Sequence, residues 1–208
     1  VATGPSVSDY SVGDVVFGMT NRFHGGVHAE RAVFSVNEIA RAPSSLSVTE
    51  AAAVPLAAQT ALQALRDCCG IEPGQQVLII GASGGVGHFS VQIATALGAS
   101  VHAVCGARNA DFARDLGADT VYDYKNQPAP KIDHPFDCVF DVFGRFSRAD
   151  FKNQLGRRGI FVSTVPRLAT IGSEILARIG VNKRGRLVQV QSNAADLRTI
   201  AQWITEGR

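Results

Sequence analysis

Cysteine is scarce in this sequence, with four residues among 208. Cys68 and Cys69 are adjacent, which excludes the C-x-x-C spacing of redox motifs and zinc knuckles. Cys105 and Cys138 each stand alone in an apolar segment. We therefore expect free thiols and a reduced, cytoplasmic environment.

Long apolar runs and an excess of one charge are also missing. No run approaches the roughly 18 residues that span a bilayer, and residues 1–10 lack the charged and apolar parts of a secretory signal. The net charge of +2 is too small to indicate a basic surface that binds nucleic acid. Because the chain begins without Met and stops just after a helical pattern, we expect a piece of a longer protein.

Residue patterns for metal or nucleophilic chemistry are lacking as well. His24 and His28 are four apart, but a glycine pair lies between them and no third ligand is near. There is no G-x-S-x-G elbow and no Cys/His nucleophile pattern. We expect His102, inside an apolar run, to be a satisfied core histidine, and Asp137 and Asp141 to have turn or cap roles.

The clearest pattern runs from Gln75 to Leu97. Its first six residues end in four branched apolar side chains, typical of a strand buried on both faces of a parallel sheet. Glycine and small residues follow over residues 81–87, and apolar residues then recur every fourth position from Phe89, as on one helical face. In a strand, glycine turn and helix, the N–H groups of the helix start bind a dinucleotide pyrophosphate.

The glycine turn alone is a weak motif. In the usual G-x-G-x-x-G register, Ala82 stands at the first glycine, and an alternative register begins at Gly81. A tight strand-to-helix turn that binds nothing is the structural alternative. A second βα unit follows directly, which favours the dinucleotide interpretation.

From residue 75 onward, strands and helices alternate. This rhythm predicts a doubly wound parallel sheet of the α/β class. The expected strands are 75–80, 100–105, 120–124, 136–142, 159–165 and 186–190. The expected helices are a short one capped by Asn109, one marked by Phe151 and Leu155, one near 171–179, and one from about Ala194.

The part before residue 48 is interpreted as β-rich. Strands are expected at residues 15–18 and in the partly alternating segment 27–36. Ser47 and Glu50 have capping-box spacing, so a helix begins there. We expect Pro55 to interrupt it, with a second helical run ending at Gly70. The predicted domains are residues 1–50 and 51–208.

The end of the second strand indicates which dinucleotide binds. A carboxylate there usually contacts the ribose 2′-hydroxyl, roughly 20 residues after the glycine turn. Residues 105–109 contain no acid but do contain Arg108. Because a guanidinium attracts a 2′-phosphate and binds it bidentately, the sequence favours NADPH. The alternative is that Arg108 is a solvated residue at a helix start.

Further motifs make the chain similar to a known family. Residues 12–18 read V-G-D-V-V-F-G, residues 26–30 read G-V-H-A-E, and residues 59–61 read Q-T-A within an apolar helix. G-G-V-G at 84–87, L-G-A-D at 116–119 and D-V-F-G at 141–144 complete the set. The chain resembles the zinc-free quinone oxidoreductase branch of the medium-chain dehydrogenase/reductase superfamily.

This resemblance implies a doubly wound Rossmann sheet with part of a GroES-like β domain, and it implies roles for single residues. Thr60, Thr164 and Val165 would lie at the nicotinamide end. The pyrophosphate would be approached by Ser83, Gly84, Gly85 and Val86, the 2′-phosphate held by Arg108 and Tyr124, and the adenosine edged by Phe143 and Gly144.

Where zinc-binding relatives carry a cysteine ligand, Leu56 stands near that position, and residues 19–29 contain no cysteine. The resemblance therefore implies an NADPH-dependent, metal-free reductase of quinones or α,β-unsaturated carbonyls, forming a homodimer in which the strand at 186–190 is a sheet edge. The catalytic residues are not identified. The alternatives are an enoyl-thioester reductase of the same fold, a non-catalytic NADPH-binding module, and a zinc alcohol dehydrogenase.

Overall fold

The computed structural model describes residues 2–21, 26–127, 130, 133–166, 172 and 184–207. By internal contacts the chain divides into two compact units. Unit 1 comprises Val1–Gln59 with Val190–Arg208, and unit 2 comprises Thr60–Gln189. His24 and nearly all of the helix expected at 171–179 lie outside the described residues.

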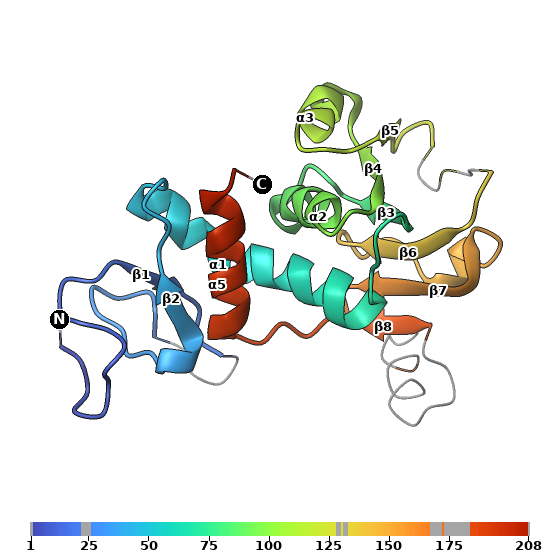
Figure 1. Cartoon of the computed structure of the whole chain (residues 1–208). Helices are drawn as coiled ribbons and strands as arrows, with labels where there is room; N and C mark the ends of the chain where they lie inside the picture. Colours follow the sequence, from blue (N-terminus) through green and yellow to red (C-terminus); the bar gives the residue numbers. More distant parts are fainter. Residues whose placement is uncertain are drawn as a thin grey trace. The chain divides into compact units, whose positions relative to one another are not determined.

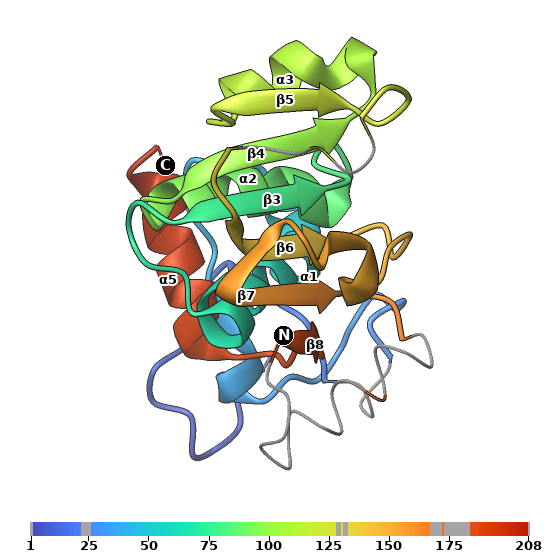
Figure 2. The same cartoon turned by 90° about the vertical axis from the view of Figure 1, so that its right-hand side faces the viewer.

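A six-stranded sheet, parallel at every pairing, forms the centre of unit 2. Figure 2 shows the strands in the order β5-β4-β3-β6-β7-β8. The strands are β3 (Gln76–Ile80), β4 (Ser100–Cys105), β5 (Thr120–Asp123), β6 (Phe136–Asp141), β7 (Leu155–Ser163) and β8 (Gly185–Leu187). The predicted α/β class with a parallel sheet is confirmed, and β8 lies at the sheet edge.

Strand β3 lies at the point where the chain changes direction across the sheet. From β3 the chain proceeds outward through β4 and β5, and it then returns to the other side of β3 with β6. Helices α2 (Gly85–Ala96) and α3 (Ala110–Asp115) form the first two connections (Figure 1). In such sheets the crevice beyond the carboxyl ends of the strands at this switch point is the usual ligand site.

Apolar side chains on the central strands explain why these segments are strands. Residues Val77, Leu78 and Ile79 of β3 are fully buried, as a parallel strand covered on both faces requires. One cluster of the core joins strands β3, β4, β6 and β7 and the short helix η4 (Arg148–Phe151). Its members are Leu78, Ile80, Val104, Phe136, Val139, Phe151 and Phe161.

Unit 1 contains a two-stranded antiparallel sheet of β1 (Val16–Gly18) and β2 (Ile39–Arg41). It also includes α5 (Ala194–Thr205), whose expected start is confirmed and whose N-cap is Asn193. The expected strand at 27–36 is wrong, because the described residues 26–35 form no strand. Instead the Glu38 carboxylate accepts a hydrogen bond from the backbone N–H of Ser35 (3.0 Å). This bond is part of a capping box at the start of the short helix η1 (Val36–Glu38).

The first long helix is continuous, contrary to the expected break. Helix α1 (Val48–Leu62) runs through Pro55 and leads into a π-helical segment, η2 (Gln63–Cys69). A proline removes one helical N–H, but the turns around it are retained by the burial of Ala51, Val54 and Ala58. The Ser47–Glu50 capping box and the end at Gly70 are confirmed.

Two local predictions in unit 2 are also wrong. Leu155 begins β7, where it pairs with Phe136, and is not part of a helix. Asn109 makes no capping bond, because its amide donates to the Ser83 hydroxyl at 3.0 Å. In both cases a partner distant in sequence replaces the local contact.

His102 is a satisfied core histidine, as predicted. Its ring nitrogens lie 3.1 Å from the Tyr122 hydroxyl and 2.9 Å from the Gln76 amide oxygen. Burial lowers the pKa of His102, since desolvation disfavours the imidazolium. The neutral ring therefore acts as a structural bridge between β4, β5 and β3.

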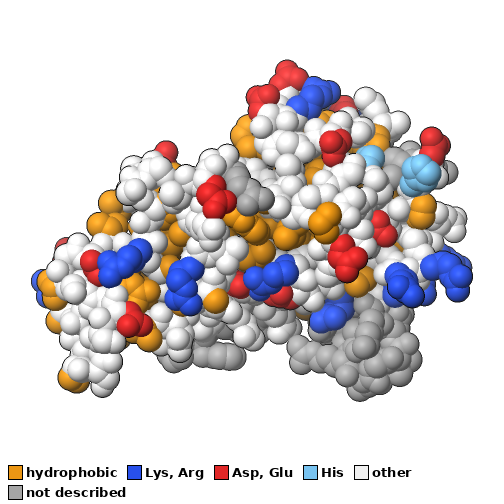
Figure 3. Space-filling model, viewed as in Figure 1, with side chains coloured by type: hydrophobic (Ala, Val, Ile, Leu, Met, Phe, Trp, Pro, Cys, Tyr) orange, Lys and Arg blue, Asp and Glu red, His pale blue; other side chains and the backbone are white. Residues whose placement is uncertain are grey.

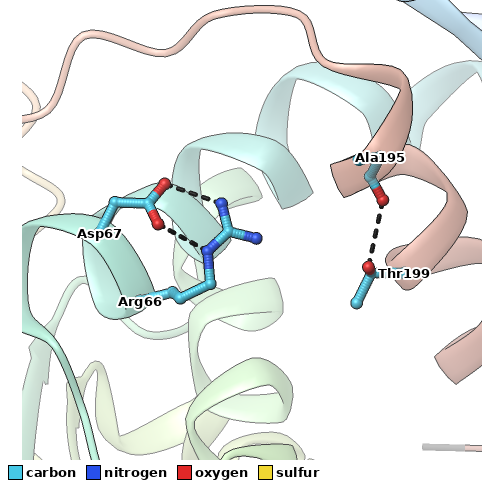
Figure 4. A network of polar contacts seen from close by, with 4 residues as sticks. All are labelled: Arg66, Asp67, Ala195 and Thr199. Carbon is cyan, nitrogen blue, oxygen red and sulfur yellow. Dashed lines mark hydrogen bonds and ion pairs between the residues drawn. The ribbon is translucent and has the colours of Figure 1, made fainter.

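On the face drawn in Figure 3, Lys and Arg side chains are spread with Asp and Glu among them, and they form no single large basic patch. Figure 4 shows two polar contacts that each stay within one element. The Asp67 carboxylate accepts from Arg66 at 2.6 and 2.8 Å, and Thr199 donates to the Ala195 carbonyl at 3.1 Å. None of the described helices has both the length and the hydrophobicity needed to cross a membrane.

Two of the four cysteines do not match the expected free thiols. Cys69 at the end of η2 and Cys138 in β6 form a disulfide, with Cα atoms 6.0 Å apart, whereas Cys68 and Cys105 keep their thiols. The pair is 69 residues apart in sequence. Only the docking of η2 against the sheet brings the two sulfurs together, so sequence spacing carries no sign of it.

We expect reduction of the Cys69–Cys138 disulfide to lower the free energy of unfolding by about 2–4 kcal/mol, because the cross-link restricts the unfolded chain. Thermal unfolding with and without dithiothreitol measures this. Cys69→Ser should lower the melting temperature and abolish its response to reductant, while the neighbouring Cys68→Ser should change neither. Four titratable thiols in the unfolded, non-reduced protein would contradict the pairing.

Candidate functional site

In the turn between β3 and α2, the backbone at the end of the strand lies very close to the backbone at the start of the helix. Gly81 has φ +87°, and Gly84 donates its N–H to the Gly81 carbonyl at 3.0 Å. A Cβ on Gly87 would lie 2.0 Å from that same carbonyl oxygen. Only glycine at position 87 therefore allows α2 to begin directly against the end of β3.

The N-terminus of α2 leaves backbone donors available. Its N-cap, Gly84, has no side chain, and the first helical bond is donated by His88 to the Gly84 carbonyl at 3.0 Å. The N–H groups of the three residues between them consequently have no acceptor within the helix. Gly84 and Gly85 are exposed, and a Cβ on Gly85 would meet nothing within 4 Å. This geometry suits an anion such as a pyrophosphate.

A pocket of about 390 Å³ opens beside this turn, within unit 2. It lies where β3, β4, β5 and β6 end, which is the switch point of the sheet. Its volume is in the range of small-molecule sites. The lining residues are Ile80, Gly81, Ser83, Gly84, Val104, Cys105, Gly106, Tyr124, Phe143, Arg145 and Phe146.

One buried carboxylate shapes the loop that follows β6. Asp141 is 0% exposed and accepts the N–H groups of Gly144 at 2.8 Å and Phe146 at 2.6 Å. Gly144 has φ +70°, and a Cβ there would lie 2.2 Å from Val165. Asp141 thus has the turn role expected from the sequence. Its hydrogen bonds hold the loop after β6 in the conformation that lines the pocket.

The electrostatic character of the pocket suits an anionic ligand. Its lining, all of it within the described part of the chain, contains no carboxylate and one guanidinium, that of Arg145. Burial raises the pKa of the Cys105 thiol, so this group is neutral at physiological pH. Within the described residues no cluster of three His, Cys, Asp or Glu side chains could bind a metal ion.

The structure brings together some of the residues to which the resemblance gives a role. Ser83, Gly84, Tyr124 and Phe143 line the pocket. The residues with an implied role that lie outside the lining are Thr60, Gly85, Val86, Arg108, Gly144, Thr164 and Val165. Of these, Gly85 and Val86 continue the helix start, and Thr164 donates to the Val142 carbonyl at 2.9 Å.

Arg108 and Thr60 have contrasting surroundings. Arg108 lies in the short helix η3 (Ala107–Asn109), directly after β4, and its side chain is exposed. Thr60 lies in α1 and is buried, with 7% exposure. Arg108 is therefore exposed beyond the end of β4 and outside the lining of the pocket.

Sequence reasoning missed Arg145. Its signal was present, since the residue directly follows the D-V-F-G mark at 141–144. Its importance depends on the loop conformation that Asp141 imposes, which the motif alone does not reveal.

Comparisons with known proteins show which family the chain resembles. The family described as zinc-binding dehydrogenase matches residues 85–162. The chloroplast envelope quinone oxidoreductase homolog of Arabidopsis thaliana is 33% identical over 193 residues, covering 88% of this chain and 59% of that protein.

Two solved structures are similar over nearly the whole chain. The quinone oxidoreductase from Coxiella burnetii has a TM-score of 0.83 at 30% identity, covering 98% of this chain and 64% of that one. An alcohol dehydrogenase superfamily protein from Novosphingobium aromaticivorans has a TM-score of 0.77 at 32% identity, covering 100% of this chain and 67% of that one.

The chain belongs to the medium-chain dehydrogenase/reductase superfamily, in its quinone oxidoreductase-like branch. It spans 59% to 67% of the length of these three relatives.

Replacement of Asp141 by asparagine should destabilise the loop after β6. The amide retains one acceptor, so one of the two N–H groups that donate to this side chain loses its partner, at a cost of about 1–3 kcal/mol. Urea unfolding of Asp141→Asn measures the loss, with the exposed Asp133→Asn as a matched control. Equal stability of the two variants would show that the Asp141 carboxylate is not what fixes the loop.

Proposed function

We propose that the chain is the nucleotide-binding part of an NADPH-dependent oxidoreductase that reduces quinones or α,β-unsaturated carbonyls without a metal. The observation that carries this proposal is the uncapped N-terminus of α2, beside a pocket lined without any carboxylate among the described residues. Family membership supports the proposed oxidoreductase activity, because the relatives include proteins named as quinone oxidoreductases.

The residues present fit a dinucleotide phosphate. Free backbone N–H groups at the start of α2 would bind the pyrophosphate, because they are directional donors at the positive end of a helix dipole. Ser83 would add a hydroxyl, whose position is fixed by the amide of Asn109 at 3.0 Å. Gly84 and Gly85 permit close approach because they carry no side chain. The bound nucleotide would supply the hydride for the reduction.

Residues of this chain would orient the two reactants and would stabilise charge. Thr60, Thr164 and Val165 are proposed at the nicotinamide end, as the family resemblance implies. With no metal proposed, an oxyanion on the substrate would be met by a backbone N–H, a hydroxyl or water. Solvent can supply the proton, and we assign no catalytic acid or base.

The metal-free proposal rests on residue identities. Leu56 stands near the position where zinc relatives have a cysteine, and residues 19–29 contain no cysteine. A homodimer using the edge strand β8, and a cytoplasmic location, are likewise proposals drawn from the sequence. The matching Arabidopsis relative is named for the chloroplast envelope, so the compartment requires its own test.

The proposed activity is tested by following NADPH absorbance with a panel of quinones, enones and an enoyl-CoA. Oxidation of NADPH by quinones or enones is expected, with metal analysis finding less than stoichiometric zinc. Turnover of the enoyl-CoA alone favours an enoyl-thioester reductase. Tight NADPH binding with no turnover favours a non-catalytic binding module, and stoichiometric zinc favours an alcohol dehydrogenase.

Arg108→Glu should reverse or abolish a preference for NADPH over NADH. The new carboxylate repels a 2′-phosphate and can accept a bond from a 2′-hydroxyl, so the Kd for NADPH should rise by about 10- to 100-fold. Fluorescence titration with each nucleotide measures the ratio. The proposal for Arg108 fails if the variant keeps the nucleotide preference of the parent chain.

A further inference from the structure

The Cys69–Cys138 disulfide has one accessible half and one buried half. Cys69 is partly exposed, whereas Cys138 is 0% exposed. Cys138 lies in β6 between two neighbouring strands, where it pairs with Val77 of β3 and Ile160 of β7. Exchange of a disulfide with a thiol requires access to the sulfur that is attacked. Cys69, and not Cys138, is therefore the half at which a thiol from solution gains access.

The disulfide holds the end of η2, which apolar packing does not hold. Ala64 and Leu65 in the first half of η2 are 0% exposed, whereas residues 66–69 are exposed or partly exposed. Gly70, with φ +64°, ends the helix directly after Cys69. Opening of the disulfide therefore releases the last turn of η2, while the buried residues keep the first part in place.

The end of η2 is connected to the elements that form the pocket. The chain continues from Gly70 into β3, which ends at the glycine turn, and η2 packs against β6, β7 and α2. Strand β6 carries Cys138 and ends at Asp141, which holds the loop beside the pocket. Elements that gain mobility must be ordered again when a ligand binds, and this ordering costs conformational entropy.

We propose that Cys69 is a site of reversible S-thiolation, at which a low-molecular-weight monothiol such as glutathione opens the Cys69–Cys138 disulfide and thereby weakens nucleotide binding. The thiolation site follows from the disulfide alone, whereas its effect on binding rests on the proposed function. In the cytoplasmic location proposed for this chain, disulfides are usually transient and serve redox sensing or catalysis.

The exchange proceeds in two balanced steps. In the first, the monothiol thiolate bonds to Sγ of Cys69, the bond between the two protein sulfurs breaks, and Cys138 leaves as a thiolate that takes up a proton. In the second, another monothiol thiolate attacks the small-molecule sulfur of the mixed disulfide. Cys69 then leaves and is protonated, and the oxidised small disulfide is released. Two electrons pass from the two monothiols to the protein, and attack by Cys138 on the mixed disulfide reverses the first step.

The thiolation site is tested in a Cys68→Ser background, so that no adjacent thiol complicates the peptide mapping. Further variants, Cys138→Ser and Cys69→Ser, are each treated with oxidised glutathione under native conditions and mapped by mass spectrometry. Cys69 in the first should gain an adduct at least about 10-fold faster than Cys138 in the second, because modification of Cys138 requires local opening of the sheet. Equal rates, or a parent disulfide that reduced glutathione opens only in urea, would overturn the site.

The effect on binding is tested by titrating NADPH into the oxidised and the reduced parent chain. Reduction should raise the Kd by about 5- to 30-fold, and by linkage saturating NADPH should shift the thiol–disulfide equilibrium in glutathione buffers toward the disulfide by the same factor. Cys69→Ser should bind NADPH as weakly as the reduced parent, with no response to reductant. Cys68→Ser is the matched control and should behave as the parent chain does.

The outcomes distinguish this proposal from the proposed function. Equal affinity of the oxidised and reduced chains for NADPH refutes the effect of thiolation on binding, while the proposed function stands. A parent chain that binds no NADPH in either state refutes the nucleotide site and the regulatory effect together. Circular dichroism that shows a folded reduced chain at the assay temperature excludes unfolding as the cause of weaker binding.

Discussion

The near contact between the carbonyl of Gly81 and the Cα of Gly87 is the constraint on which the site depends. Any side chain at position 87 would overlap that carbonyl, with a Cβ only 2.0 Å away. Because the contact is made, α2 begins immediately beyond β3 and its first N–H groups emerge beside the pocket. The same glycine that closes the turn therefore also aims the helix dipole at the ligand position.

A second constraint acts on the other boundary of the pocket. Asp141 ends β6, and burial of its carboxylate is compensated by two short bonds from the following loop. Such a buried group is tolerable only when it is hydrogen-bonded. As β3 and β6 are neighbours in the sheet, the glycine turn and the Asp141 loop meet at one edge. The topology of the sheet thus assembles a site from segments about 60 residues apart.

Local patterns predicted the elements well where the chain is strongly apolar. The four branched residues that end β3 are buried, and the predicted strand at 100–105 coincides with β4. Prediction failed where burial or the absence of a pairing strand, neither of which a short pattern reveals, overrides a local signal. Pro55 does not break α1, because buried alanines and Val54 stabilise the turns around it. The partly alternating segment 27–36 pairs with no strand of the described chain, and Val33 in it is 94% exposed.

By itself, the sequence determined the α/β class, the glycine turn, the missing acid after β4 and the family, since each depends on residue types close together in the chain. Only the tertiary structure decided that Cys69 lies against Cys138 and that Arg145 faces the pocket. The physical reason is common to both. The disulfide depends on how η2 packs against the sheet, and the position of Arg145 depends on which strands end beside β6. Both are set by long-range packing, on which short sequence patterns carry no information.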